Sequence, residues 1–304
     1  MPYIGFNAKG DLRTAEQVRM ADSLLGRFPQ SLKKKMVIRV AGGTRSQKTF
    51  LRDWSEDKVR HWADLQKKHG VRMVYTVNGN DTPENQLKVI RRFMDAGVTF
   101  DFLEMMTEYY LPKFRLGKTE RPEVTRVVTV EDYLFEILPE YWKVLDPLGL
   151  PYYVIYAPHK PHSSNKQQEY YNAWNEKMNE ALNGKYADRD LHAVLHLYQR
   201  GSEPYDYGQI SRLRNHLPQG RHIGVTEAGV IDPDKSYEEI APRVRAHYLG
   251  ILRELNAGDY FMDQVLYTDY KNDNSSTLHS EFTESNGLTP KGKAVVDLIL
   301  ETYR

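Results

Sequence analysis

The sequence predicts an α/β protein folded as a single (β/α)₈ TIM barrel. Short apolar runs alternate with longer amphipathic segments from end to end, a pattern typical of parallel strands joined by helices. Eight such pairs are present, the number that closes a barrel. With 304 residues, of which 40% are hydrophobic, one barrel can account for the whole chain. We therefore expect residues 1–304 to form one domain of the catalytic type.

An open doubly wound sheet is the alternative fold. Such a sheet usually begins with a glycine-rich phosphate turn of the form GxGxxG, whereas the stretch after the first apolar run reads GFNAKG. The chain also has no low-complexity segment and no obvious linker. These observations favour the closed barrel.

Eight apolar runs are the predicted strands. They are YIGFN (3–7), MVIRVA (36–41), RMVYTV (72–77), FDFLEMM (100–106), YYVIYA (152–157), HAVLHLY (192–198), HIGVTE (222–227) and DQVLYTDY (263–270). One segment with apolar positions three and four residues apart follows each strand and predicts a helix. The predicted helices cover 14–28, 55–70, 82–97, 129–149, 167–184, 206–217, 236–255 and 289–304.

The ends of the predicted helices carry residues typical of helix termini. Candidate N-caps are Ser55, Thr82, Thr129, Ser236 and Thr289. Glycines that follow helix ends are Gly70, Gly97, Gly149 and Gly184. The boundary signals therefore agree with the pattern of apolar residues.

Composition excludes several classes of function. Lys+Arg 42 against Asp+Glu 41 leaves a net charge of +1, so no global field attracts nucleic acid or an anionic membrane. The absence of cysteine excludes a disulfide framework, a thiolate nucleophile and a Cys-ligated zinc. No signal peptide and no apolar stretch of about 20 residues is visible. We expect a soluble protein, cytoplasmic as given; export by another route and the oligomeric state stay open.

The residues that end the strands are the candidates for chemistry, because active sites of parallel barrels lie at the carboxyl ends of the strands. They are Asn7, Arg39 with Gly42 and Gly43, Asn78, Glu108, His159, His196 with Tyr198, Glu227, and Tyr267 with Asp269. Glu108 and Glu227 end the fourth and seventh strands, on opposite sides of the barrel mouth. Two facing carboxyl groups suit glycoside cleavage, either by retention at about 5–5.5 Å or by inversion at about 6.5–9.5 Å. For either glutamate alone a solvated rim residue is the favoured interpretation, whereas the pair at these two strands favours chemistry.

Glu104 lies four residues before Glu108 in the stretch FDFLEMMTEYY. Strand alternation places Glu104, Met106 and Glu108 on one face, with Glu104 below the mouth, where an unpaired carboxylate is costly. Arg39 is the expected partner, and a Glu104–Arg39 pair would support the catalytic layer from beneath. Direct contact of Glu104 with substrate is the alternative.

The histidines do not predict a metal centre. His192 and His196 share a strand face but stand roughly 13 Å apart along it, too far for one metal ion. His159 and His162 lie in the loop sequence PHKPH, as candidates for substrate contact. No strand ends in lysine, so a Schiff base is not favoured. We expect no metal and no cofactor, with His196 lining the pocket.

Short motifs spread in order along the chain resemble those of retaining glycosidases of the clan A superfamily. The resemblance is strongest to the xylosidase, arabinofuranosidase and glucuronidase branches. The motifs are IRVAGGT for an Arg-x-x-Gly-Gly turn, YTVNGN, LEMMTEYY for Glu-x-Gly-Asn-Glu, HLY for His-x-Tyr, GVTEAG for Thr-Glu, and GLTPKGKAVVDLI. Together they extend over the whole chain.

The resemblance implies a retaining glycoside hydrolase that needs no cofactor and acts on a carbohydrate, either an oligosaccharide or a glycoside. It implies Glu108 as general acid/base and Glu227 as nucleophile. Arg39 would orient Glu227 and keep it ionised, and Tyr198 would donate a hydrogen bond to it. The implied substrate-binding residues are Arg39, Asn78, Thr107, His159, His196, Tyr198 and Tyr267.

Two positions depart from the family pattern. Thr107 stands where clan members carry an asparagine that binds the sugar 2-hydroxyl, and Met106 stands where they carry glycine. A threonine hydroxyl is shorter than an amide and has one donor instead of two. The alternative function is therefore a catalytically impaired barrel that acts as a carbohydrate-binding or assembly protein.

Overall fold

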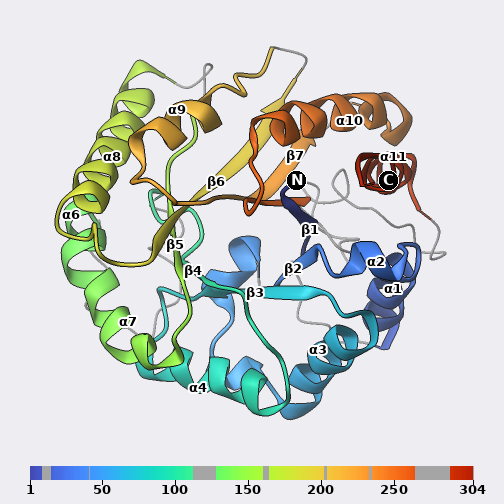
Figure 1. Ribbon diagram of the computed structural model, residues 1–304, viewed down its shortest axis with the longest axis horizontal. Coiled ribbons are helices and arrows are strands. Elements are labelled where there is room, and N and C mark those ends of the chain that lie inside the picture. The colour runs from blue at the N-terminus through green and yellow to red at the C-terminus, as the bar shows by residue number, and fades with distance from the viewer. Residues whose placement is uncertain are drawn as a thin grey trace.

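The computed structural model is a closed barrel of eight parallel strands ringed by helices (Figure 1). It describes residues 1–8, 15–40, 42–111, 128–159, 164–201, 204–232, 235–263 and 288–303. The strands follow one another around the barrel in chain order, and β8 pairs with β1 to close it. The predicted (β/α)₈ fold is therefore confirmed.

The strands other than the last lie where the apolar runs predict them. Their bounds are β1 Tyr3–Asn7, β2 Met36–Val40, β3 Arg72–Val77, β4 Leu103–Met105, β5 Tyr152–Ile155, β6 Leu191–Arg200 and β7 Ile223–Ile231. β4 is shorter than predicted, because the backbone turns away after Met105. β6 and β7 are longer, because they continue to pair with each other as far as Arg200 and Ile231.

The eighth strand begins three residues earlier than predicted. β8 is Tyr260–Asp263, which shares only Asp263 with the predicted run, and residues 264–270 lie outside the described residues. Three consecutive apolar residues, Tyr260, Phe261 and Met262, suit a strand covered on both faces. Asp259 holds the start of this strand, because its side chain accepts hydrogen bonds from the backbone of Asn256 and Ile223.

The helices also follow the prediction, with additions. The main helices are α1 Ala15–Gly26, α3 Glu56–His69, α4 Pro83–Asp95, α8 Asn165–Asn183, α9 Gln209–His216, α10 Tyr237–Glu254 and α11 Pro290–Thr302. The fourth helical region is divided into α6 Val130–Asp132, the π-helical turn η4 Tyr133–Ile137, α7 Leu138–Leu145 and η5 Asp146–Leu148. The short elements α2 Gln30–Lys33, η1 Gly43–Lys48 and η2 Leu51–Asp53 were not predicted.

The predicted N-caps are confirmed. The side-chain oxygens of Ser55, Thr82, Thr129, Ser236 and Thr289 each accept a hydrogen bond from a backbone N–H in the first turn of the helix that follows. Gly70 and Gly149 end their helices in the left-handed conformation, at φ 68° and 66°. Local sequence therefore positions the helix ends.

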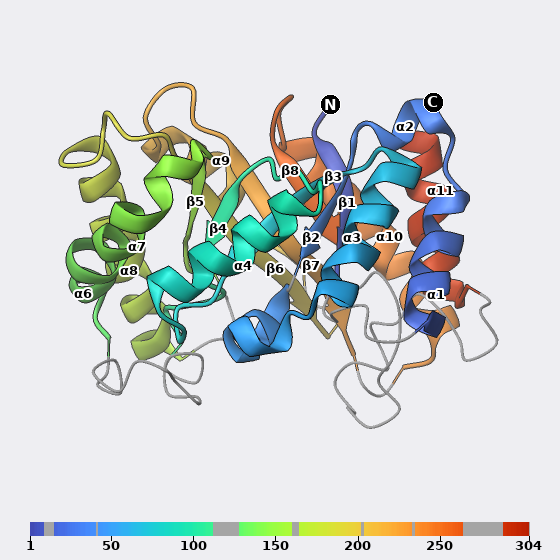
Figure 2. The ribbon, with the colours of Figure 1, turned by 90° about the horizontal axis from the view of Figure 1, so that it is seen from below.

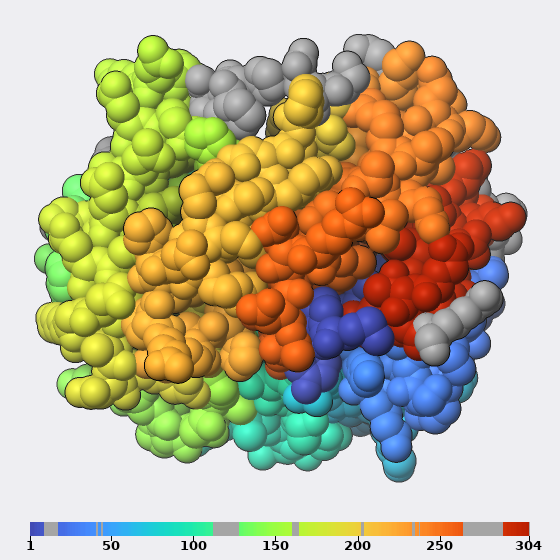
Figure 3. Space-filling model, turned by 45° about the horizontal axis from the view of Figure 1, so that its top comes forward, coloured from blue at the N-terminus to red at the C-terminus, as the bar shows by residue number. Residues whose placement is uncertain are grey.

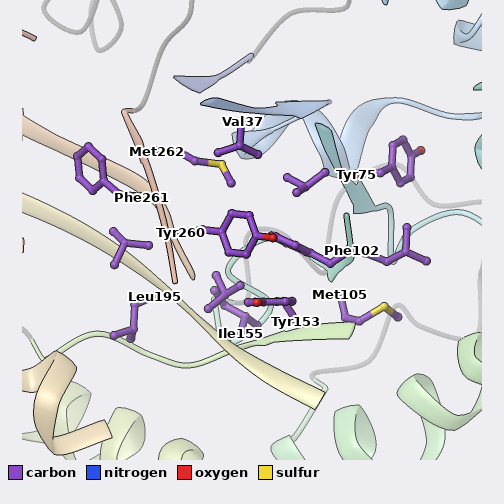
Figure 4. Close-up of a cluster of buried hydrophobic side chains, with 14 of the residues drawn as sticks. Val37, Tyr75, Phe102, Met105, Tyr153, Ile155, Leu195, Tyr260, Phe261 and Met262 are labelled. Atoms are coloured by element: carbon purple, nitrogen blue, oxygen red, sulfur yellow. The ribbon is translucent and has the colours of Figure 1, made fainter. Parts of the chain in front are cut away.

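Aromatic side chains fill the amino-terminal part of the barrel (Figure 4). Phe102 stacks on Tyr153 with ring centroids 3.9 Å apart and meets Tyr260 edge to face at 4.9 Å. Glu104 follows Phe102 by two residues and therefore lies one layer nearer the carboxyl ends of the strands. In Figure 2 the N-terminus lies at the upper side, so these carboxyl ends point to the lower side.

The two ends of the described chain lie side by side. Figure 3 shows α11 against α10 and next to β1 at the surface. The hydroxyl of Tyr303, just after α11, donates a hydrogen bond to the carbonyl of Pro2. Within the described residues, no helix has both the length and the apolar character that crossing a bilayer requires.

Candidate active site

Arg39, on β2, is the centre of a buried charged cluster at the carboxyl ends of the strands. Its Nε donates to Oε2 of Glu104 at 2.8 Å, its Nη2 donates to Oε1 of the same carboxylate, and its Nη1 donates to Oε1 of Glu227 at 2.6 Å. All three side chains are buried. The predicted Glu104–Arg39 pair is thus present, and the same guanidinium also holds Glu227.

The charges of the cluster shift the pKa values of its members. Burial by itself would raise the pKa of Glu104, but the nearby Arg39 and His196 outweigh it and hold that pKa below its usual value. Burial by itself would lower the pKa of Arg39, but the carboxylates of Glu104 and Glu227 outweigh it and hold that pKa above its usual value. Glu104 and Arg39 therefore stay ionised at neutral pH.

A bulge in β7 directs Glu227 into the cluster. Leu195 of β6 pairs with Val225, whereas the next residue, His196, pairs with Glu227, so Thr226 is the extra residue. The Oε2 of Glu227 accepts a hydrogen bond from the Tyr198 hydroxyl at 2.5 Å. With Arg39 on the other oxygen, both oxygens of this carboxylate have a donor.

Glu108 reaches the site through a sharp turn instead of a strand. β4 ends at Met105, and both Met106 and Glu108 have positive φ angles, of 70° and 43°. The expectation that Glu104, Met106 and Glu108 share one strand face is therefore wrong, because alternation ends with the strand. The Met106 side chain packs against Gly79, and Thr107 takes the position against Arg39, with Nη2 2.9 Å from its Oγ1.

His196 lies between the three carboxylates. Its Nδ1 is 3.6 Å from Oε1 of Glu108 and 3.8 Å from Oε1 of Glu227, and its Nε2 is 3.6 Å from Oε1 of Glu104. Oε1 of Glu108 and Oε1 of Glu227 both lie near Nδ1 of His196, so the distance between these two oxygens cannot exceed the sum of their distances to that nitrogen. That limit admits the separation of about 5–5.5 Å of a retaining pair and also the lower end of the range of about 6.5–9.5 Å of an inverting pair.

Burial by itself would lower the pKa of His196, but Glu227, Glu104 and Glu108 raise it to about 9. The imidazole is therefore positively charged at neutral pH. Two cations, Arg39 and His196, face three carboxylates, so the cluster is electrically neutral when one carboxylate carries a proton.

The shifted pKa of His196 predicts how stability changes with pH. A folded-state value of about 9 against an ordinary 6.5 means that the stabilisation is complete below about pH 6.5 and is lost as the pH rises through about 9. Denaturant unfolding across this range should show a decline on the order of a few kcal/mol in the wild type. The His196→Gln variant should show a flatter profile; an identical decline in both proteins would contradict the assignment.

The other predicted site residues lie elsewhere or outside the described residues. Asn78 is buried, its Nδ2 donates to the carbonyl of Thr49 at 3.0 Å, and its Oδ1 accepts from the backbone of Asn80 at 2.8 Å, so its amide joins two loops. His159 lines a cavity of about 230 Å³ between α8 and α9, and no member of the charged cluster lines it. Tyr267, Asp269 and His162 lie outside the described residues.

The sequence did not single out three residues of the site. Tyr110 donates a hydrogen bond to Oε1 of Glu108 at 3.2 Å, Thr226 lies 3.1 Å from Nε2 of His196, and Ser46 lies 2.8 Å from the Thr107 hydroxyl. Tyr110 lies in the motif LEMMTEYY and Thr226 in the motif GVTEAG, so their closeness in sequence to Glu108 and Glu227 could have identified them. Ser46 has no such signal, because the short helix η1 brings it to β4 from a distant part of the chain.

The glycine at position 42 has a steric explanation. A Cβ on Gly42 would lie 1.3 Å from Oδ1 of Asn7 and 3.0 Å from Nη1 of Arg39. Any side chain there would displace the Asn7 amide and crowd the guanidinium of Arg39, which holds Glu104 and Glu227. Within the described parts of the chain, no group of His, Asp and Glu side chains is arranged to hold a metal ion.

The closed barrel, with carboxylates gathered at the carboxyl ends of its strands, has the architecture of the (β/α)₈ enzymes. No protein-family model and no curated protein sequence matches the chain. Solved structures do match its fold. GH5_18 from Streptomyces cattleya, in complex with Manb1-4GlcNAc, has a TM-score of 0.61 and 13% identity over 99% of this chain and 81% of that one.

Two other solved structures have the same barrel. A family 39 glycoside hydrolase from the gut symbiont Bacteroides cellulosilyticus WH2 has a TM-score of 0.57 and 14% identity, over 98% of this chain and 64% of that one. A GH10 endoxylanase retrieved from a sugarcane soil metagenome has a TM-score of 0.52 and 12% identity, over 98% and 96% of the two chains. The chain therefore shares its (β/α)₈ barrel fold with these glycoside hydrolases.

Proposed function

We propose that this protein is a retaining glycoside hydrolase, with Glu227 as nucleophile and Glu108 as general acid/base. The observation that carries the proposal is the convergence of both carboxyl groups on Nδ1 of His196, at 3.6 and 3.8 Å, from opposite sides of the barrel. The fold shared with glycoside hydrolases supports it.

The surroundings of the two glutamates suit these different roles. Glu227 accepts hydrogen bonds from Arg39 and Tyr198, which stabilise its ionised form and fix its orientation. Glu108 is more exposed, at 14% of its side chain against 6% for Glu227, and Tyr110 is its hydrogen-bond donor in the described structure. Exchange of a proton with substrate or water needs such access.

In the proposed reaction, Glu108 donates its proton to the glycosidic oxygen while the Glu227 carboxylate attacks the anomeric carbon. The carbon–oxygen bond breaks, the alcohol leaves with the proton, and the sugar is esterified to Glu227. Glu108 then removes a proton from water, which attacks the anomeric carbon and releases the sugar and Glu227. The proton returns to Glu108, so the cycle balances without a cofactor.

The proposed substrate is an O-glycoside or an oligosaccharide. One structural neighbour was solved with Manb1-4GlcNAc, and another, an intracellular xylanase from Thermoanaerobacterium saccharolyticum, with xylotetraose. These ligands belong to those proteins and indicate only that similar barrels hold carbohydrates. They support a sugar as the ligand of the present site.

A carbohydrate-binding or assembly protein is the second candidate function. Its support is Thr107, which replaces the asparagine of the resembling family and whose hydroxyl contacts Arg39 and Ser46. If the missing amide is essential for turnover, the barrel binds sugars without cleaving them. The candidate is tested by the same experiment as the first.

Trapping of the covalent intermediate tests the proposal. A 2-deoxy-2-fluoro glycoside with a good leaving group should inactivate the protein and add one sugar mass to the peptide that contains Glu227. The Glu227→Gln variant is the control and should remain unlabelled. A label on another residue would contradict the assigned nucleophile. Absence of both label and turnover, together with measurable sugar binding, would favour the second candidate.

A further inference from the structure

We propose that Thr107 is a positioning residue that fastens the turn carrying Glu108 to Arg39 and offers the substrate no hydroxyl. The inference rests on the proposed function, because it assigns Glu108 a role in the reaction. It departs from the substrate contact that the resemblance implies for position 107.

The turn on either side of Thr107 is strained. Met106 and Glu108 both have backbone angles in the left-handed region, at φ 70° and 43°, although neither is glycine. A non-glycine residue in this region is strained and persists only where its surroundings hold it. The turn brings Glu108 to His196, so contacts along it must hold the chain in place.

The side chain of Thr107 supplies such contacts. Its Oγ1 accepts a hydrogen bond from Nη2 of Arg39 at 2.9 Å and lies 2.8 Å from Oγ of Ser46. Ser46 has one proton and also lies within hydrogen-bond distance of the Gly43 carbonyl, at 2.8 Å. The Ser46 hydroxyl can donate to either acceptor, and toward Thr107 it adds a second donor to the one from Arg39. The Thr107 oxygen is thus engaged by two groups within the protein.

Burial keeps the Thr107 hydroxyl away from substrate. Thr107 and Ser46 are each only 1% exposed. The hydroxyl therefore points into the protein, toward the arginine that also binds Glu227. Through Arg39, Thr107 links the segment that carries Glu108 to the carboxylate of Glu227.

Other groups hold the same turn from the outside. The Tyr133 hydroxyl, at the start of the π-helical turn η4, donates to the carbonyl of Met105 at 2.8 Å, and the backbone N–H of Leu111 donates to the carbonyl of Glu108 at 2.7 Å. These bonds fix the two ends of the turn, whereas Thr107 fixes its centre. Loss of the Thr107 hydroxyl should therefore displace Glu108 without unfolding the barrel.

The test compares Thr107→Val with Thr107→Ser on two substrates, an aryl glycoside and its 2-deoxy analogue. For a positioning residue, Thr107→Val should lower kcat about 10- to 100-fold with KM nearly unchanged, because small misplacements of a catalytic group have effects of this size. The loss should be equal on both substrates, and Thr107→Ser should restore most of it. A loss confined to the 2-hydroxy substrate, or no loss at all, would overturn the proposal.

Thr76→Val is the matched control. Thr76 is also buried, on the neighbouring strand β3, and its hydroxyl has no hydrogen-bond partner in the described part of the chain. This variant should keep wild-type kinetics.

If the wild type cleaves no glycoside, the proposed function fails, and crystal structures of the two valine variants still decide the role of Thr107. Glu108 should move away from His196 only in Thr107→Val. An unchanged Glu108 would refute the positioning role.

Discussion

The Glu227→Gln variant should lose glycosidase activity by a factor on the order of 10⁴ or more in kcat while remaining folded. The amide lacks the negative charge that attacks the anomeric carbon. Its oxygen still accepts the hydrogen bond from Arg39, and Glu104 still neutralises that guanidinium, so no buried cation is left without a counter-charge. Steady-state kinetics on an aryl glycoside, with a thermal melt to confirm folding, would measure the effect.

The Glu108→Gln variant should behave differently, because it loses only proton transfer. A decrease of about 10²–10⁴-fold is expected for a glycoside whose alcohol is a poor leaving group. The decrease should be much smaller for an acidic phenol, which leaves without protonation. Glu84→Gln, at an exposed position on α4, is the control and should match the wild type. Full turnover in either active-site variant would refute the assignment.

Periodicity and end signals predicted most of the barrel because they are local. The capping serines and threonines act within one helical turn, and alternating segment types leave few possible topologies. The eighth strand was misplaced for a physical reason. Its buried run, Tyr260–Met262, is short and lies beside a longer apolar run that had the stronger strand signal.

Parts of the candidate site were also readable from the sequence. Arg39, Glu104, Tyr198 and Glu227 were named from their places on strands, and the structure brings them into direct contact. A rule of alternation works as long as the backbone is extended. The Glu104–Arg39 pair followed from strand position, whereas the contacts of Arg39 and Tyr198 with Glu227 followed from the family resemblance.

The rest of the site depends on irregular backbone, which the sequence does not reveal. The bulge at Thr226 and the turn at Met106–Glu108 change which side chains point inward, and neither has a glycine to mark it. Ser46 depends on the packing of η1 against the end of β4. Bulges and turns of this kind form where several chain segments pack against one another, and this packing exists only in the closed barrel.

Replacement of Arg39 by methionine should destabilise the protein by about 3–5 kcal/mol, the usual effect of removing one partner of a buried ion pair. Glu104 is fully buried and would lose its hydrogen-bonded cation, which leaves His196 as the cation that faces it. The melting temperature should fall on the order of 10 °C for a chain of this size. Arg60→Met is the control, since its ion pair with Asp57 is exposed and should change stability by less than about 1 kcal/mol.

Two measurements identify why Arg39→Met is less stable. One is the pH dependence of the stability loss, and the other is the effect of a second substitution at Glu104. In the wild type, the lowered pKa of Glu104 means that its stabilisation is present above the ordinary value and is lost as the pH falls through the folded value. Without Arg39, the effect of burial on Glu104 is opposed by His196 and no longer by the guanidinium, so the deficit of Arg39→Met should shrink as the pH is lowered and Glu104 becomes protonated. The double variant Arg39→Met, Glu104→Gln should be more stable than the single one at neutral pH. A deficit that is independent of both pH and residue 104 would mean that Arg39 stabilises the barrel by packing and not by neutralising its carboxylates.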